Sequence, residues 1–388
     1  MLRRSLVIGA LSAGAIAAGA MTAGLPAAQA VNPLSHHGQS VPADSLRALG
    51  AKTGLRVGVA VNADLLNKDA AYTKIVAQQF STVTPENAMK WESVEPTQGT
   101  YDWSGGDALV KFARKHKQLV RGHNLVWHSQ LPKWLSPDGQ GNTSPFTNAQ
   151  LKKILKKHVQ DEARHFKGKI WQWDVVNEAF NEDGTPRQDI WYKAWGNSLG
   201  YIADAFRWAH EADPKALLFY NDFNIEFTGP KSNAEYAFFK GLVAKHVPID
   251  GIGFQTHLST QFAFPDLRAN LQRFADLGLD VAETEVDIRT QTTWPDAPNT
   301  PTNPLARYAQ ASYWSQALQA CLAVRQCISF TAWGVADSNS WIPTTFHGEG
   351  AALLYNDDLQ PKLEYSVVQQ DLELAAGAPH RHGRGAKD

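Results

Sequence analysis

The stretch "IWQWDVVNEAF" (170–180) puts an aromatic and β-branched apolar run directly in front of an asparagine and a glutamate. A short apolar run of this kind is typical of a strand that is buried in a parallel sheet. Burying an unpaired carboxylate at the end of such a strand costs several kcal/mol. Glu178 is therefore expected to pair, to shift its pKa or to take part in chemistry.

Similar runs recur along the chain and alternate with amphipathic, helix-like segments. Eight candidate strands lie at 55–61, 80–87, 119–127, 170–178, 216–222, 249–257, 280–288 and 328–337, and a short helix is expected at 42–49. Strands that alternate with helices form βα units and a parallel sheet. Because no G-x-G-x-x-G motif follows the first strand, we predict an α/β fold with a single (β/α)8 TIM barrel rather than a doubly wound sheet.

The two ends of the chain differ from this pattern. Residues 1–30 begin with a pair of arginines, continue as an Ala/Gly-rich apolar stretch and end on Ala-Gln-Ala, which predicts a secretory signal peptide cleaved after Ala30. A membrane anchor is less favoured because the apolar stretch is short and broken by Gly and Ser. Sec and twin-arginine export both remain open. The barrel is assigned to 31–375, and the Gly-rich basic segment 376–388 is predicted to be a disordered tail.

Composition excludes some partners and favours others. The 37 basic and 38 acidic residues give a net charge of −1, which argues against nucleic acid or a membrane as partner. The chain has 13 Trp, 10 Tyr and 17 Phe, and exposed aromatic rings are good platforms for the apolar faces of sugars. The two cysteines, Cys321 and Cys327, are six positions apart, and in an exported chain we predict a structural disulfide between them.

Polar residues fall near the ends of most predicted strands. In a barrel these ends converge on one face, where the active site lies. One such residue could be a helix N-cap, but capping alone does not explain so many carboxylates, amides and imidazoles. The residues are Glu86, Asn87, His123, Asn177, Glu178, Asn221, Asp222, Gln255, His257, Glu285 and Asp337.

Two carboxylates on different strands, many aromatic residues and no cofactor motif suggest glycoside hydrolysis. That reaction needs one protonated carboxyl group and one ionised carboxylate. Glu178 is the natural acid, because apolar walls and a second carboxylate would keep its proton on near neutral pH. Glu283, Glu285 and Asp287 share one strand face by alternation, so spacing leaves the partner open and only favours the latter two.

The histidines do not predict a metal site. His123 and His128 are five positions apart and would point to opposite faces of a strand. Neither they nor His257 belong to an H-x-H pair or to another ligand set typical of a metal site. We therefore predict no metal and no cofactor. A further group is expected to consist of ordinary structural or surface histidines: His128, His158, His165 and His210.

"WDVVNEAF" together with "TEVDI" resembles the active-site pair of glycoside hydrolase family 10, the retaining endo-1,4-β-xylanases. Further blocks follow that family's order: "VTPENAMKWESVEPTQGTYDW", "RGHNLVWHSQLPKW", "YNDFNIE", "GIGFQTHL" and "AWGVADSNSW". The resemblance runs from about residue 45 to 372. It implies a secreted, bacterial-type enzyme that cleaves internal bonds of xylan, binds xylan and xylo-oligosaccharides and needs no cofactor. A monomer is the default expectation for a secreted enzyme that degrades a polymer.

Carried over residue by residue, the resemblance makes Glu178 the acid/base and Glu285 the nucleophile. It implies carboxyl groups about 5 to 5.5 Å apart and a covalent glycosyl-enzyme with retention of configuration. The remaining residues would bind the next sugar on the non-reducing side (Glu86, Asn87, Lys90), hold the sugar being cleaved (His123, Trp127, Asn177), position Glu285 (Gln255, His257) and wall the subsites (Trp333, Trp341).

Two other functions fit parts of this pattern. A member of the same family could act on another plant β-glycoside, such as a mixed glucan or a saponin sugar, because a glutamate pair does not define the sugar. A non-catalytic sugar-binding protein on a barrel scaffold would normally lack one of the two carboxylates. Since Glu178 and Glu285 are both present, this reading is disfavoured.

Overall fold

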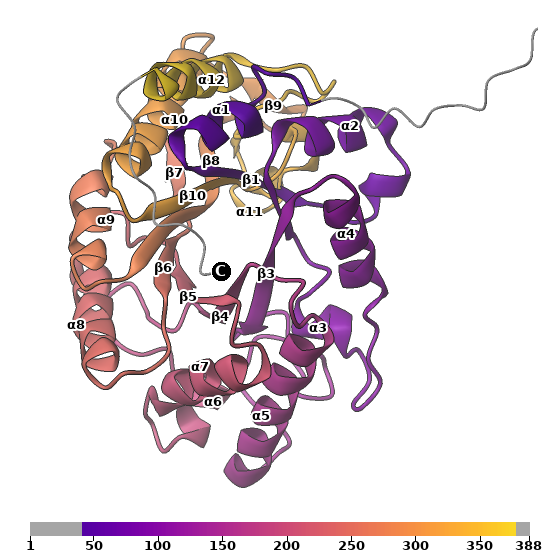
Figure 1. Cartoon of the computed structure of the whole chain (residues 1–388), viewed down its shortest axis with the longest axis vertical. Coiled ribbons are helices and arrows are strands. Elements are labelled where there is room, and N and C mark those ends of the chain that lie inside the picture. Colours follow the sequence, from indigo (N-terminus) through magenta and orange to yellow (C-terminus); the bar gives the residue numbers. More distant parts are fainter. Residues whose placement is uncertain (1–40, 378–388) are drawn as a thin grey trace, which may run out of the picture. The chain divides into compact units, whose positions relative to one another are not determined.

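A computed structural model describes residues 41–377, so the predicted signal peptide and residues 378–388 of the predicted tail lie outside the described residues. Eight strands pair in parallel, each with its neighbour, and the pairings of β10 with β1 and with β8 close the sheet into a barrel. This confirms the predicted (β/α)8 barrel (Figure 1). The barrel strands are β1 (Arg56–Val61), β2 (Thr82–Pro85), β3 (Leu119–Val126), β4 (Gln172–Asn177), β5 (Leu217–Asp222), β6 (Gly251–Phe254), β8 (Asp280–Thr293) and β10 (Cys327–Ala332).

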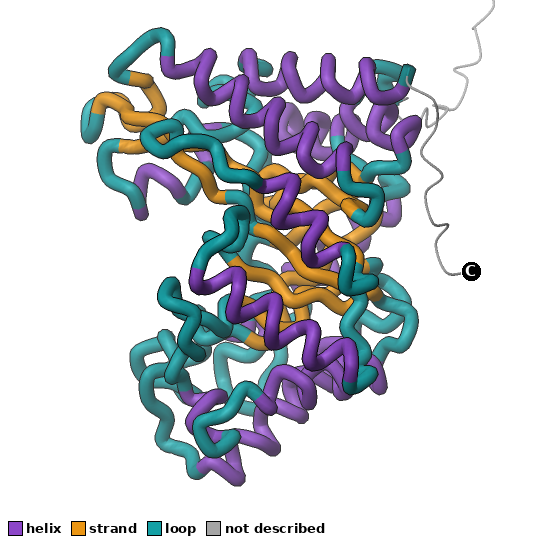
Figure 2. Tube along the Cα trace, turned by 90° about the vertical axis from the view of Figure 1, so that its left-hand side faces the viewer, coloured by secondary structure: helices purple, strands orange, loops and turns teal. Residues whose placement is uncertain are grey.

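Helices pack around the outside of these strands, as Figure 2 shows in purple and orange. They bury one face each against the barrel; the described buried residues of α5, for example, recur at helical spacing from Leu151 to Ala163. The α-helices are α1 (Leu46–Thr53), α2 (Ala70–Gln79), α3 (Trp91–Val94), α4 (Ser104–Lys115), α5 (Asn148–His165), α6 (Ile190–Ala194), α7 (Gly200–Ala212), α8 (Pro230–Ala244), α9 (Leu267–Ala275), α10 (Ala306–Ala323), α11 (Ile342–Thr345) and α12 (Leu363–Ala376).

The boundaries predicted near the two ends of the described chain were wrong, and the strand predicted at 328–337 ends at Ala332. The first helix spans 46–53 rather than 42–49, because the side chain of Ser45 accepts a hydrogen bond from Ala48 N and caps its start. It ends where Gly54 adopts a left-handed conformation, with φ of 78°. At the other end α12 continues to Ala376, one residue into the segment predicted to be a tail.

Three shorter strands lie beyond the barrel. The segment predicted as one strand at 249–257 divides into β6 and β7 (His257–Ser259), and β7 pairs in parallel with β8. β8 itself is longer than predicted and continues to Thr293, pairing in antiparallel fashion with β9 (Ala297–Pro301) and β11 (Glu349–Gly350). This extension brings the loop that follows β10 against the strand that carries Glu285.

The apolar run that forms β4 packs into the core as expected. Trp173 on β4 is fully buried and lies across Gly122 on the neighbouring strand β3. A Cβ atom at residue 122 would stand 2.2 Å from the indole ring, so this crossing requires glycine. Close packing here fixes the register between β3 and β4, whose ends carry site residues.

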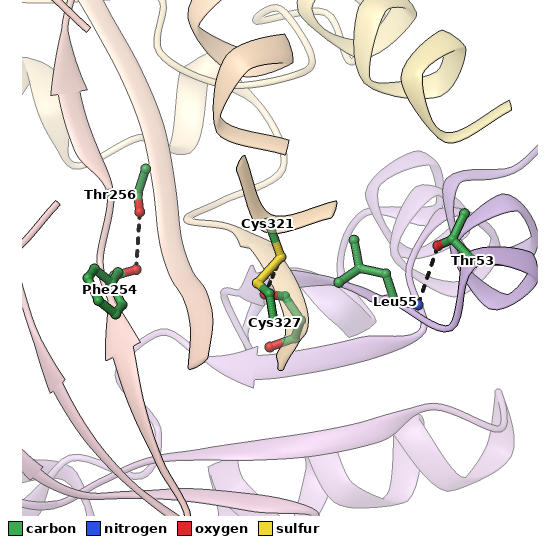
Figure 3. The surroundings of a disulfide bond; sticks show 7 residues. Thr53, Leu55, Phe254, Thr256, Cys321 and Cys327 are labelled. Carbon is green, nitrogen blue, oxygen red and sulfur yellow. Dashed lines mark hydrogen bonds between the residues drawn. A yellow bond between two sulfur atoms is a disulfide. The ribbon is translucent and has the colours of Figure 1, made fainter. Parts of the chain in front are cut away.

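The predicted disulfide is present. Cys321 near the end of α10 bonds to Cys327 at the start of β10, with Cα atoms 5.3 Å apart (Figure 3). Both residues are buried beside the barrel strands. The bond ties a barrel helix to the strand that follows it.

Replacing both cysteines by serine should lower the free energy of unfolding by about 2 kcal/mol, the value that the loop-entropy model gives for so short a loop. The disulfide closes a short loop, because the two cysteines are only six positions apart in the sequence. Urea unfolding followed by tryptophan fluorescence measures the change. A loss several times larger would mean that the bond stabilises the native packing itself, and an unchanged midpoint would contradict the prediction.

Candidate active site

Two glutamates from different strands face one site at the carboxyl ends of the barrel strands. Glu178 directly follows β4, and Glu285 lies in β8. Two asparagines bridge them: Asn221 Nδ2 donates to Glu285 Oε1 at 2.7 Å and to Asn177 Oδ1 at 2.8 Å. Asn177 Nδ2 in turn donates to Glu178 Oε1 at 3.1 Å. The two carboxylates are thus joined by a continuous hydrogen-bonded chain.

The Glu178 carboxylate accepts hydrogen bonds from four side chains. Trp127 Nε1 donates to Oε2 at 2.8 Å, and His128 Nε2 lies 3.3 Å from the same oxygen. Gln255 Nε2 donates to Oε1 at 3.0 Å, beside the bond from Asn177. All four groups present an N–H to the carboxylate, an arrangement that favours its ionised form.

Glu178 does not have the apolar surroundings that were predicted to keep its proton on near neutral pH. Burial raises the pKa of Glu178, but hydrogen bonds from His128, Gln255 and Trp127 and attraction to the His128 charge outweigh it and lower the pKa to about 2. Burial and a second carboxylate were visible in the sequence, whereas the converging donors come from three other segments of the chain.

Glu285 is buried and faces several positive or hydrogen-bonding groups. His257 Nε2 lies 3.4 Å from Oε2, and Arg121 Nη2 lies 3.8 Å from Oε1. Burial raises the pKa of Glu285, but the bond from His257 and the nearby charges of His123, His257 and Arg121 outweigh it and lower the pKa. The carboxylate is therefore held ionised, as a nucleophile must be.

The other two carboxylates of β8 have different surroundings. Asp287 Oδ2 accepts hydrogen bonds from His257 Nδ1 and from Trp341 Nε1, each at 2.9 Å. Asp287 therefore orients these two side chains and does not itself face the site. Glu283 is fully buried, and burial raises its pKa well above the usual range. The geometry therefore favours Glu285 among the three candidates that strand alternation left open.

His257 stands between Asp287 and Glu285. Burial lowers its pKa, but the charge and hydrogen bond of Asp287 and those of Glu285 outweigh this and raise the pKa to about 10. The imidazolium form is thus present throughout the usual assay range. It donates one N–H to each carboxylate and holds Glu285 in its ionised state.

Replacing His257 by Asn should therefore raise the pKa of Glu285 and move the acid limb of the kcat/KM profile to higher pH, because a nucleophile loses activity when it is protonated. Near neutral pH we expect a loss of about 10- to 100-fold, the effect of one hydrogen bond to a charged group. A pH profile of kcat/KM measures both changes. The remote variant His116→Asn should leave the profile unchanged, and an unmoved acid limb in His257→Asn would refute the mechanism.

Gln255 differs from its predicted position. It was expected to position the nucleophile, but its side chain donates to Glu178 and lies 3.4 Å from Asn177 Oδ1. Only its backbone carbonyl serves Glu285, by accepting the Glu285 N–H at 3.0 Å. The side chain therefore acts on the carboxylate at the end of β4.

Below the carboxylates lies a buried ionic cluster inside the barrel. Arg121 forms two hydrogen bonds to Asp174, and His123 Nδ1 contacts the same carboxylate at 2.8 Å. Arg121 also donates to the backbone carbonyl of Thr284, next to Glu285. The cluster fixes His123, a predicted sugar-binding residue, and places the positive charge of Arg121 near Glu285.

The remaining predicted site residues form two groups, the first of which is centred on Lys90. Lys90 Nζ donates to Asn87 Oδ1 at 2.9 Å and to Gln130 Oε1 at 2.6 Å, and it lies 5.0 Å from the Trp127 ring. Burial raises the pKa of Glu86 and lowers that of Lys90, whose charge is in turn attracted by Glu285.

Two indole rings form the second group. Trp333 meets His123 edge-on with ring centroids 5.2 Å apart, and Trp341 meets His257 at 5.0 Å. Each indole thus contacts a histidine that also contacts a buried carboxylate.

Five residues of the site were given no function from the sequence. His128 was expected to be an ordinary histidine, yet it contacts Glu178; Asn221 was recognised only as a strand-end amide. A buried arginine and aspartate in adjacent apolar strands must pair, which is a signal that the sequence does contain. The five are Arg121, His128, Gln130, Asp174 and Asn221.

Residues 41–377 contain no group of three or more His, Cys, Asp or Glu side chains arranged to hold a metal ion. None of the helices described over this range is long and apolar enough to cross a membrane. What the site presents is a pair of bridged carboxylates with amide, imidazole and indole groups around them. This donor set suits acid/base and nucleophilic chemistry on a neutral, hydroxyl-rich substrate.

Comparison with known proteins gives one consistent result. The family model described as Glycosyl hydrolase family 10 matches residues 45–371. The chain is 40% identical over 303 residues to endo-1,4-beta-xylanase C of Phanerodontia chrysosporium, covering 77% of this chain and 72% of the relative. It is 37% identical over 341 residues to endo-1,4-beta-xylanase B of Thermotoga neapolitana, covering 86% and 92%. The similar relatives are mostly fungal, so they do not support the expected bacterial type.

Solved structures give the same picture. The crystal structure of xylanase 10B from Thermotoga petrophila RKU-1 in complex with xylobiose matches with a TM-score of 0.80 and 36% identity. The match covers 88% of this chain and 99% of that one. Native xylanase 10B from Thermotoga maritima matches with a TM-score of 0.78 and 37% identity, covering 86% and 99%.

Proposed function

Because the chain belongs to glycosyl hydrolase family 10, we propose that it is an endo-1,4-β-xylanase that cleaves internal bonds of xylan with retention of configuration. One observation carries the chemistry of this proposal: Glu178 and Glu285 face one site and are joined through Asn177 and Asn221. The names of the relatives and the bound xylobiose of one of them support xylan as the substrate.

The first step forms a covalent glycosyl-enzyme. The ionised carboxylate of Glu285 attacks the anomeric carbon while the bond to the leaving oxygen breaks, and Glu178 gives its proton to that oxygen. In the second step a water attacks the same carbon, its proton passes to Glu178, and Glu285 leaves as a carboxylate. Two inversions at one carbon give net retention.

The hydrogen bonds around the Glu178 carboxylate lower its pKa and favour the ionised form. The first step therefore requires that Glu178 gains a proton before the leaving oxygen departs.

Sugar binding would use the Lys90 group and the two indole rings. The predicted residues on the non-reducing side are Glu86, Asn87 and Lys90, which lie together near Trp127. Trp333 and Trp341 would offer indole surfaces to the sugar chain, since both rings lie next to the histidines around Glu285. Amide and charged groups then bond the hydroxyls and fix the sugar's orientation.

Secretion as a monomer is part of the proposal, because xylan is an extracellular polymer and the first thirty residues have the composition of a signal peptide. Amino-terminal sequencing of protein from the culture medium should find Val31 first. A protein that remains inside cells with its Met1 intact would overturn this part alone. Size-exclusion chromatography with light scattering would test the monomer.

Products from xylan and from carboxymethylcellulose test the activity. We expect short xylo-oligosaccharides from xylan and no cleavage of carboxymethylcellulose, with the β-anomer as the first product seen by NMR. The α-anomer as first product would contradict retention. Activity on neither polymer would point to another β-glycoside as the substrate of the same carboxylate pair.

A further inference from the structure

The backbone at Glu178 has an unusual conformation. Its φ of 57° lies in the left-handed region, which non-glycine residues rarely adopt and which costs on the order of 1 kcal/mol or more. Such a conformation persists only where neighbouring groups hold it. The carboxyl group can be aimed at the substrate only while the peptides on both sides of Glu178 are fixed.

Backbone hydrogen bonds hold most of this segment. Glu178 N donates to Asn221 O at 2.9 Å, and Arg187 N donates to Ala179 O at 2.9 Å. Arg187 Nε donates to Glu178 O, also at 2.9 Å. The peptide that follows Glu178 has a different partner: Ala179 N donates to the hydroxyl oxygen of Tyr220 at 2.9 Å.

Tyr220 is the point where this segment joins a buried polar network. It lies in β5, which pairs with β4 in the barrel (Figure 1). Its side chain is fully buried. Its hydroxyl donates to Asp222 Oδ2 at 2.5 Å. Since a hydroxyl has one proton, its direction toward Asp222 leaves lone pairs free for Ala179 N–H.

The network behind Tyr220 is anchored by charge. Lys231 Nζ on α8 lies 2.8 Å from Asp222 Oδ1 and 3.1 Å from Glu182 Oε1, in the loop that follows Glu178. Burial raises the pKa of Tyr220 well above its usual range, and the charge of Asp222 raises it further, so the phenol keeps its proton. Burial and Asp222 likewise raise the pKa of Glu235, which lies 3.4 Å from the Tyr220 hydroxyl.

We propose that the Tyr220 hydroxyl is a positioning group for the acid/base: by accepting the Ala179 N–H it fixes the peptide after Glu178 and so aims the carboxyl group at the leaving oxygen. This inference rests on the proposed function, because it assumes that Glu178 protonates that oxygen. Tyr220 does not touch the sugar. Its effect passes through the Ala179 amide. With phenylalanine in place of Tyr220, this buried N–H would lose the hydroxyl that accepts its hydrogen bond.

The experiment compares two substrates whose leaving groups differ in their need for a proton. The sugar that is released from xylotetraose would leave as an unstable alkoxide unless it is protonated, whereas dinitrophenolate is a stable anion and needs no acid. For Tyr220→Phe, kcat/KM on xylotetraose should fall about 10- to 100-fold, since a misplaced acid loses much of its effect. On dinitrophenyl β-xylobioside, kcat/KM should stay within about threefold of wild type, because this quantity reports only the step before water attacks.

The matched control is Tyr72→Phe. Tyr72 on α2 is also buried, and its hydroxyl also accepts a backbone N–H, that of Asn62 at the end of β1. It should lose comparable stability in thermal unfolding and leave both kcat/KM values near wild type. An equal loss on both substrates in Tyr220→Phe, or no loss on either, would overturn the proposal. A wild-type enzyme that cleaves neither substrate would instead overturn the proposed function.

A second variant covers the case in which Tyr220→Phe does not fold. Asp222→Asn keeps the shape of the side chain but weakens the acceptor that fixes the Tyr220 hydroxyl proton. We expect the same dependence on the leaving group with a smaller loss on xylotetraose, about three- to tenfold. A loss that is independent of the leaving group would again overturn the proposal.

Discussion

Glu285→Ala should lower kcat/KM on xylo-oligosaccharides by about 10⁴-fold or more, because removal of a catalytic nucleophile typically leaves only residual activity from binding and the remaining groups. The expected loss is the same for dinitrophenyl β-xylobioside, since a good leaving group does not replace the nucleophile. Steady-state kinetics on both substrates measure it. The removed carboxylate leaves space beside His257 and Asn221, whose N–H groups then face solvent or a small anion.

Azide in the assay tests whether the lost group was the nucleophile. Azide bound in that space should attack the anomeric carbon of the dinitrophenyl substrate and give the α-glycosyl azide, with inverted configuration. Glu283→Gln is the matched control, because Glu283 lies two residues earlier on β8 and its raised pKa keeps it neutral like the glutamine. Activity of Glu285→Ala within tenfold of wild type would refute the assignment, as would a tenfold loss in Glu283→Gln.

The barrel could be predicted from the sequence because each of its strands is a local signal. The apolar runs around Trp173 and Val281 show their burial directly in residue type, and turns and helices separate them. The far end of β8 was missed for a physical reason. Beyond Ile288 the strand is only half-buried, rich in Thr and Gln, and it is paired with β9 and β11, which come later in the chain.

The sequence predicted the site residues that lie at strand ends but not the contacts of those that lie in the loops beyond. Alternation of strand faces was applied to His128, but β3 ends at Val126, so His128 lies in a loop where that rule has no force. Gln255 follows β6, and Thr256 then adopts a positive φ of 60°, which changes the direction of the chain. Both side chains turn toward Glu178, and spacing along the sequence contains no information about that turn.

The same loops explain why the surroundings of Glu178 differ from the prediction. Residue type shows that a carboxyl group is buried, and burial alone raises its pKa. The opposing effect comes from donors on the β3 and β6 loops and on Asn177, whose geometry only the fold defines. A buried carboxylate with four donors is a different electrostatic case from one against apolar walls.

Glu178→Ala should lower kcat/KM on xylotetraose by about 10³- to 10⁴-fold, the upper range for loss of a general acid. Unlike Glu285→Ala, it should leave kcat/KM on dinitrophenyl β-xylobioside within a few-fold of wild type, because that leaving group departs without a proton. Its kcat should nevertheless fall, since water attack on the glycosyl-enzyme then has no base. The ratio of kcat/KM on the two substrates therefore distinguishes the acid from the nucleophile: it should change in Glu178→Ala and stay nearly constant in Glu285→Ala.

Azide again gives the decisive product. In Glu178→Ala the glycosyl-enzyme on Glu285 still forms, so azide should raise kcat and yield the β-glycosyl azide, the opposite anomer from that of Glu285→Ala. Glu211→Gln on α7, outside the site, should respond to azide no more than wild type does. If Glu178→Ala gave the α-azide, or lost both substrates equally, Glu178 would not be the acid/base, and the hydrogen-bonded chain from Asn177 to Asn221 would join the nucleophile to a binding residue instead.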